Sequence, residues 1–151
     1  MEFPQLLRIR VFEERSGLGV AGLALKIVLF AKEKNNYTIP LVTGASGKAE
    51  LSIEHVRQSI KDDWELFPMD YISPLEDCLP DVEIRVCSAD DVNRTVEAMK
   101  KFSSASTISN QLIEAFEHAV NSWYVPKTQR FNIEQNRYIA IGVASISHGR
   151  S

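Results

Sequence analysis

The sequence lacks the features that mark secreted or membrane-spanning proteins. It contains two cysteines, Cys78 and Cys87, which do not form a Cys-x-x-Cys pair, and such sparse use of cysteine fits a reducing compartment. The N-terminus has no basic segment followed by a long apolar run, so no secretory signal is predicted. The longest apolar stretch, 20–31, is interrupted by Lys26 and is too short to cross a bilayer. We therefore expect a cytoplasmic protein that has no membrane partner.

Dense positive charge is also absent. The chain has 17 Lys and Arg against 20 Asp and Glu, for a formal net charge of -3, and no segment gathers enough cations to neutralise a run of phosphates. We therefore do not expect nucleic acid as a partner. A chain of 151 residues buries enough surface to fold without a metal or a disulfide. We expect one globular domain over 1–151 with no cofactor.

Alternation of apolar and polar residues predicts several β-strands. In the first of them Leu7, Ile9 and Val11 share one face, which is the pattern of a half-buried strand. The second is apolar on nearly both faces and is expected to be central. Pro40 favours an edge position for the third, and the glycine-rich turn 44–47 predicts a hairpin from the third to the fourth. The predicted strands are 6–13, 23–30, 37–43, 48–52, 81–87 and 138–146.

Helical periodicity is present near 53–64, 89–101 and 107–123. In the second segment Ser88 is a predicted N-cap, and a stripe formed by Val92, Val96 and Met99 is expected to be buried. The expected buried stripe of the third segment is Ile108, Leu112, Phe116, Ala119 and Trp123. Together these patterns predict an α+β fold, an antiparallel β-sandwich with two or three amphipathic helices.

Two segments of the first third of the chain resemble prealbumin-like domains, the group that contains transthyretin, 5-hydroxyisourate hydrolase and carboxypeptidase regulatory-like modules. They are VFEERSGLGVAGLAL at 11–25 and LVTGASGKAEL at 41–51. The resemblance implies a sandwich in which a strand, a glycine turn, a central strand and a second glycine turn follow one another. The strand and turn signals point to the same architecture.

The catalytic positions of the hydrolase in that family are not kept. Arg10 stands where the hydrolase has a histidine, and Lys48 stands where it has an arginine. The final residues 148–151 are His-Gly-Arg-Ser instead of Tyr-Arg-Gly-Ser. Because no general base or substrate clamp is recognisable, no catalytic residue is predicted. A small hydrolase with a diverged site built from Arg10, Lys48 and His148 remains the alternative function.

The most distinctive segment lies between the first predicted helix and the strand at 81–87. It mixes carboxylates with aromatic residues and prolines, and its carboxylates lack the regular spacing of a calcium-binding loop, so no metal is expected. The aromatic residues either hold the loop against the sandwich or form a surface for a partner. The candidate binding residues are Trp64, Phe67, Asp70, Tyr71, Glu76 and Asp77.

Two functions from different classes are compatible with these patterns. The first is a non-catalytic protein-interaction or assembly module with a protein partner. Because sandwiches have exposed edge strands, we also expect self-association, with a homodimer as its simplest form. The second is the hydrolase. A concave pocket with convergent polar groups favours the enzyme, whereas an unpaired edge or an exposed apolar patch favours the module.

Overall fold

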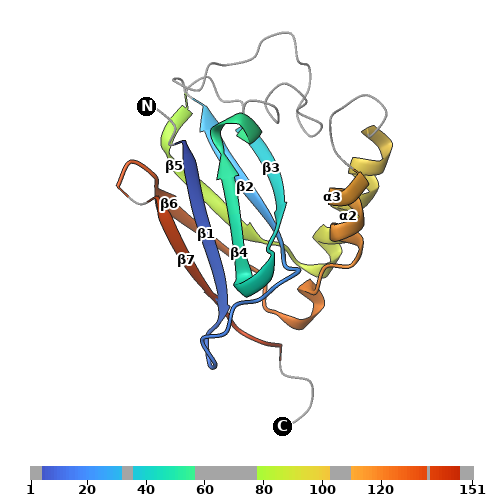
Figure 1. The fold of residues 1–151 in the computed structure, drawn as a ribbon. Helices are drawn as coiled ribbons and strands as arrows, with labels where there is room; N and C mark the ends of the chain where they lie inside the picture. The colour runs from blue at the N-terminus through green and yellow to red at the C-terminus, as the bar shows by residue number, and fades with distance from the viewer. Residues whose placement is uncertain (1–4, 32–35, 57–77, 103–109, 136, 147–151) are drawn as a thin grey trace.

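The computed structural model describes residues 5–31, 36–56, 78–102, 110–135 and 137–146 (Figure 1). Within them the fold is α+β, with two β-sheets, the helices α2 and α3, and a further helical segment at 53–56. One sheet has the strand order β4-β1-β7, and the other has the order β3-β2-β5-β6. The strands are β1 (Leu6–Glu13), β2 (Ala24–Ala31), β3 (Asn36–Val42), β4 (Lys48–Ser52), β5 (Cys78–Val86), β6 (Lys127–Asn132) and β7 (Tyr138–Val143).

Much of the predicted strand arrangement is confirmed. β2 lies between β3 and β5, as its apolar character on both faces requires. β3 is an edge strand, and Pro40 faces Lys26 in its register with β2. The expectation of a purely antiparallel sandwich is wrong for one pair, because β1 and β7 run parallel. β7 follows β6 through a short turn but joins the other sheet, so its direction beside β1 is set by that connection.

The predicted hairpin between 37–43 and 48–52 is also wrong, because β3 and β4 belong to different sheets. The turn between them, η1 (Ala45–Gly47), carries the chain across the sandwich. It lies so close to β1 and to the link from β1 to β2 that a Cβ on Gly47 would be 2.1 Å from the Val11 carbonyl oxygen and 2.7 Å from the Val20 nitrogen. Gly47 has φ of 75°, which also favours glycine. This contact between the two links replaces the hairpin.

The main core lies between the two sheets. β1 contributes the predicted Leu7, Ile9 and Val11, and the two sheets together form one buried cluster. The central strand β2 supplies Leu25, Ile27 and Leu29 from the opposite side, each with at most 1% of its surface exposed. Burial of these side chains provides most of the free energy that holds the sheets together.

A second, smaller core lies between the outer face of the four-stranded sheet and two helices, α2 (Ala89–Phe102) and α3 (Asn110–Glu117) (Figure 1). The predicted N-cap is confirmed, because the Asp91 amide donates to Ser88 Oγ at 3.1 Å. The predicted stripe of α2 is buried as expected. Its residues pack with Ala24 and Cys87 of the sheet and with residues of α3; the buried members of this cluster are Ala24, Cys87, Val92, Val96, Met99, Ile113 and Phe116.

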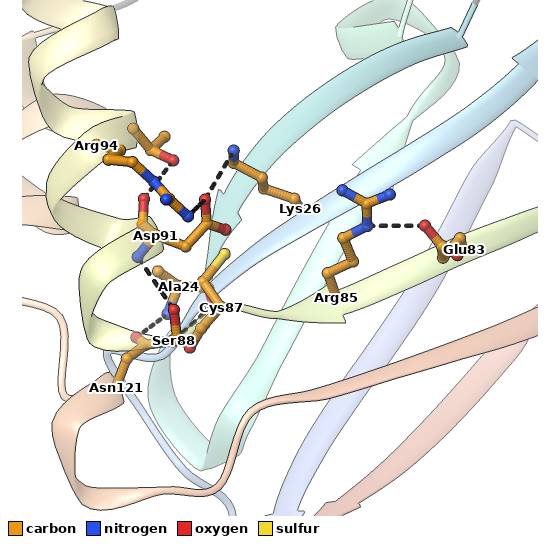
Figure 2. A network of polar contacts seen from close by, with 10 residues as sticks. Ala24, Lys26, Glu83, Arg85, Cys87, Ser88, Asp91, Arg94 and Asn121 are labelled. Carbon is orange, nitrogen blue, oxygen red and sulfur yellow. Dashed lines mark hydrogen bonds and ion pairs between the residues drawn. The ribbon is translucent and has the colours of Figure 1, made fainter.

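The third predicted helix is shorter than expected. α3 ends at Glu117, and a separate short turn, η3 (Asn121–Trp123), follows it. Trp123 was expected in the buried stripe, but 60% of its surface is exposed. Beyond the end of the helix, the Asn121 side chain binds the sheet: it accepts from the Ala24 amide at 2.8 Å and donates to the carbonyls of Ala24 and Cys87 at 3.0 and 2.7 Å (Figure 2).

Two further segments differ from or limit the predictions. Of the first predicted helix, 53–56 are helical, and 57–64 lie outside the described residues. β6 was not predicted, because five of its six residues are polar or charged and it has no apolar face. In the part of the chain that the structure describes, no helix has the length and apolar character needed to span a membrane.

Candidate interaction surface

The predicted binding residues of the acidic and aromatic segment, from Trp64 to Asp77, all lie outside the described residues. His148 of the alternative hydrolase site lies outside them as well. The structure therefore places none of these side chains. Arg10 and Lys48, the other two residues of the alternative site, are described.

Arg10 and Lys48 are brought together as direct partners in the register of β1 and β4. Arg10 Nη2 donates to the Gly17 carbonyl at 3.0 Å, and its guanidinium lies 5.7 Å from the centre of the Phe12 ring. The carboxylate that lines the same hollow as Lys48 is Glu50, which pairs with Arg8. Among the described residues, no group of three or more His, Cys, Asp or Glu residues that could hold a metal gathers anywhere.

The hollow beside Lys48 on the three-stranded sheet is small. It has a volume of about 140 Å³ and is lined by Arg8, Ile9, Lys48, Ala49, Glu50 and Tyr138. Pockets that hold metabolite-sized ligands have volumes of roughly 300–1,000 Å³. Among the described residues, the lining also includes no histidine or cysteine. This geometry does not favour hydrolysis of a small substrate.

The surface that sequence reasoning missed is the free edge of β6. On its other side β6 pairs with β5, and Thr128 and Arg130 face Arg85 and Glu83 in that register. The Ile133 amide donates to the Pro80 carbonyl at 2.9 Å. The backbone N–H and C=O groups of successive residues point to opposite sides of a strand. This bond therefore shows that the backbone groups of the odd-numbered residues of β6 point toward β5. The backbone groups of Thr128 and Arg130 therefore point away from β5.

A bond on the far side of β5 supports this assignment. The Cys87 amide donates to the Ala24 carbonyl at 3.3 Å, so the odd-numbered residues of β5 are directed to β2 and the even-numbered ones to β6. Thr128, Gln129 and Arg130 are all exposed. In the middle of β6, the backbone donors and acceptors that point away from β5 are thus paired with no described strand and lie at an exposed position.

The other three sheet edges are each partly closed. β3 contains Pro40, which has no amide hydrogen. On β4 the Lys48 carbonyl accepts from the Gly44 amide at 2.7 Å. On β7 the Gly142 carbonyl accepts from Lys127 Nζ at 2.8 Å. Natural proteins protect their edges with such devices, and the middle of β6 has none of them.

The only charged side chain in the middle of β6 is held away from the edge. The Arg130 guanidinium lies over the Phe30 ring on β2, 4.4 Å from its centre, on the outer face of the four-stranded sheet. Thr128 and Gln129 are uncharged, so no repulsion between like charges opposes the approach of a second strand to this edge.

Exposed apolar side chains lie just before β6. Trp123 and Val125 have 60% and 46% of their surfaces exposed. Their backbone is fixed, because the Val125 amide donates to the Ala144 carbonyl at 2.9 Å and the Ile146 amide donates to the Trp123 carbonyl at 2.8 Å. An exposed tryptophan on a rigid backbone is typical of protein interfaces.

Comparison with known proteins gives no match, either to the models of protein families or to curated proteins. The function is therefore argued from the geometry of this chain. One signal in the sequence pointed to β6: Pro126 ends the preceding segment, and Thr128 and Phe131 are residue types that favour strands.

Proposed function

We propose that the chain is a non-catalytic protein-interaction module that assembles with a second copy of itself through the free edge of β6. The observation that carries this proposal is the pair of exposed, outward-pointing backbone segments at Thr128 and Arg130. A strand that adds to such an edge completes the sheet, and its main-chain hydrogen bonds supply the recognition.

The geometry favours one register for two identical edges. A two-fold axis places Thr128 opposite the partner's Arg130, and Arg130 opposite the partner's Thr128. Each of these two pairs exchanges two hydrogen bonds, about four in total. Gln129 then lies on the axis, opposite the partner's Gln129.

The apolar residues beside the edge add to this ladder. Four hydrogen bonds contribute only about 2–6 kcal/mol at roughly 0.5–1.5 kcal/mol each, and association costs at least about 4 kcal/mol in lost freedom. Trp123 and Val125 precede the N-terminal end of β6, beside the proposed ladder of hydrogen bonds. Burial of their exposed surface in the dimer would supply the remaining free energy of association. We expect a reversible dimer with a micromolar Kd.

Two further features complete the proposal. A prealbumin-like arrangement is supported by the contact between Gly19 and Gly47, because it joins the two segments that resemble that family. A cytoplasmic location is supported by Cys87, which is buried and forms no disulfide with a described residue.

Disulfide trapping tests the register. In a Cys78→Ser background, Gln129→Cys places two thiols at a non-hydrogen-bonded position, where opposed Cα atoms are about 4.5 Å apart, within the range of a disulfide. We expect mild oxidation to convert this variant to a covalent dimer. The readout is a non-reducing gel together with light scattering of the unoxidised protein.

Thr128→Cys in the same background is the matched control. In the proposed register its symmetry mate lies on the diagonal, about 7–8 Å away, beyond the usual reach of a disulfide. Equal trapping of the two variants, or a monomeric mass for the wild type across the micromolar range, would contradict the proposal.

A further inference from the structure

The outward-facing residues of the three-stranded sheet form a basic surface on an acidic chain. We call this set the basic face. It holds three cations and one carboxylate, whereas the whole chain has a net charge of -3. Its members are Arg8, Arg10 and Phe12 of β1, Lys48, Glu50 and Ser52 of β4, and Tyr138, Ala140 and Gly142 of β7.

Two of the cations repel each other. Arg10 and Lys48 are direct partners in the register of β1 and β4, and like charges at such positions destabilise a sheet. No carboxylate of the described residues forms an ion pair with either of them, since the salt bridges of this face are limited to Arg8 and Glu50. An anion supplied from outside would relieve this repulsion.

The third cation is held only weakly. Arg8 Nε lies 3.4 Å from Glu50 Oε2, and the two side chains are 61% and 58% exposed. Exposed ion pairs of this kind contribute little to stability, so the Arg8 guanidinium can turn to a second acceptor. Tyr138, which is 58% exposed, faces Arg8 from β7.

These side chains surround the hollow of about 140 Å³, which Lys48 also lines. Its volume suits one acidic side chain and is too small for a metabolite, because sites for small molecules are larger and bury most of their ligand. The remaining members of the basic face are partly or fully exposed, as expected of a surface for a polypeptide.

We propose that the basic face binds an acidic segment of a partner protein, with one carboxylate seated between Arg8 and Lys48 beside Tyr138. Charge complementarity favours this occupant over a nucleic acid: three cations on short strands of an acidic protein neutralise too few phosphates for stable binding. The basic face contains no residue of β6, so this inference goes beyond self-association, and failure of the trapping test leaves it unaffected.

The test uses a labelled twelve-residue peptide in which Asp and Glu alternate with Ser and Gly, followed by fluorescence anisotropy. Lys48→Glu reverses one charge of the hollow, and we expect it to weaken binding about tenfold. Lys101→Glu makes the same charge change on the exposed surface of α2 and is expected to alter the affinity less than about twofold.

Three results would overturn the inference. Equal weakening by the two variants would mean that only net charge matters. Equal binding of a peptide with Asn and Gln in place of the acids would remove the role of the carboxylate. Tighter, Lys48-dependent binding of a single-stranded DNA twelve-mer would make the occupant a nucleic acid.

Discussion

The two sheets differ in how their outer faces are used. α2 and α3 cover the outer face of the four-stranded sheet around Ala24 and Cys87. The outer face of the three-stranded sheet has no helix of the described residues packed on it, and it presents Arg8, Lys48 and Tyr138 to solvent. Figure 1 shows both helices on the side of β3 and away from β7.

The difference follows from the two strands that lie at the centres of the sheets. β2 buries Leu25, Ile27 and Leu29 in the main core and also has apolar Ala24 and Val28 on its other face. β1 alternates strictly, and its outward residues include two arginines. An apolar outer face requires a covering layer, whereas a charged one is stable in water. The face that needs no cover is the one available for binding.

On the face covered by the helices, the buried cation Lys26 is paired with a carboxylate. Lys26, on the outer face of β2, has only 8% of its surface exposed. Its Nζ lies 3.5 Å from Asp91 Oδ1 on α2, and Arg94 approaches the same carboxylate at 3.5 Å (Figure 2). A buried cation requires such a partner, whereas Lys48 on the open face does not.

The largest expected effect is on the helix-covered face. Phe116→Ala removes a side chain with 0% exposure from the smaller core, and large-to-small changes at such sites cost about 3–5 kcal/mol. Tyr138→Ala, the matched aromatic change on the open face, should cost less than about 1 kcal/mol. Urea unfolding of both variants measures the contrast, and equal losses of stability would remove the distinction between the two faces.

A smaller effect is expected where the covering layer is attached to the sheet. Asn121→Ala leaves the Ala24 amide and the carbonyls of Ala24 and Cys87 without their side-chain partner. Buried polar groups that lose a partner cost about 1–3 kcal/mol, so we expect a loss of about 2–3 kcal/mol in thermal or urea unfolding. Asn93→Ala, at an exposed position of α2, is the control. If both variants unfold alike, Asn121 does not anchor the helices.

The smallest effect concerns pH at the end of β4, where the three-stranded sheet meets the helical residues 53–56. Burial lowers the pKa of His55 from its ordinary value of 6.5. As the pH falls below 6.5, the unfolded chain therefore binds more protons than the folded chain. The part of the free energy of unfolding that depends on His55 is fully present above that pH and is lost as the pH falls through the lower pKa of the folded state.

His55→Gln should flatten this part of the stability profile, measured by urea unfolding above and below pH 6.5. The control is His118→Gln, which changes an exposed histidine just after the end of α3. If His118→Gln flattens the stability profile and His55→Gln leaves it unchanged, burial of His55 has no effect on stability.

Local patterns predicted much of the fold. The alternation in 6–13 and the glycine turn before 48–52 predicted the observed bounds of β1 and β4, and Ser88 marked the start of α2. These features depend on residues close in sequence, where period and capping chemistry act directly. β6 and the early end of α3 were not predictable in this way, because an edge strand needs no buried face and Asn121 acts on residues far from it in sequence.

The candidate site was less predictable than the fold. Arg10 and Lys48 were singled out from a family resemblance, and only the register of β1 and β4 placed them opposite each other. The free edge of β6 is defined by which backbone groups remain after β5 has paired. No residue type signals such an edge, because every residue except proline has the same backbone groups.

The sequence by itself determined which strands are buried on one face and which on two, and where α2 begins. Those properties follow from the period of apolar residues and from local hydrogen bonds. Only the tertiary structure decided that the link after β3 crosses between the sheets, that β7 runs parallel to β1, and which edge and face are left exposed. These outcomes depend on the packing of distant segments, such as the approach of Gly47 to Val11, and that packing is fixed only when the whole core forms.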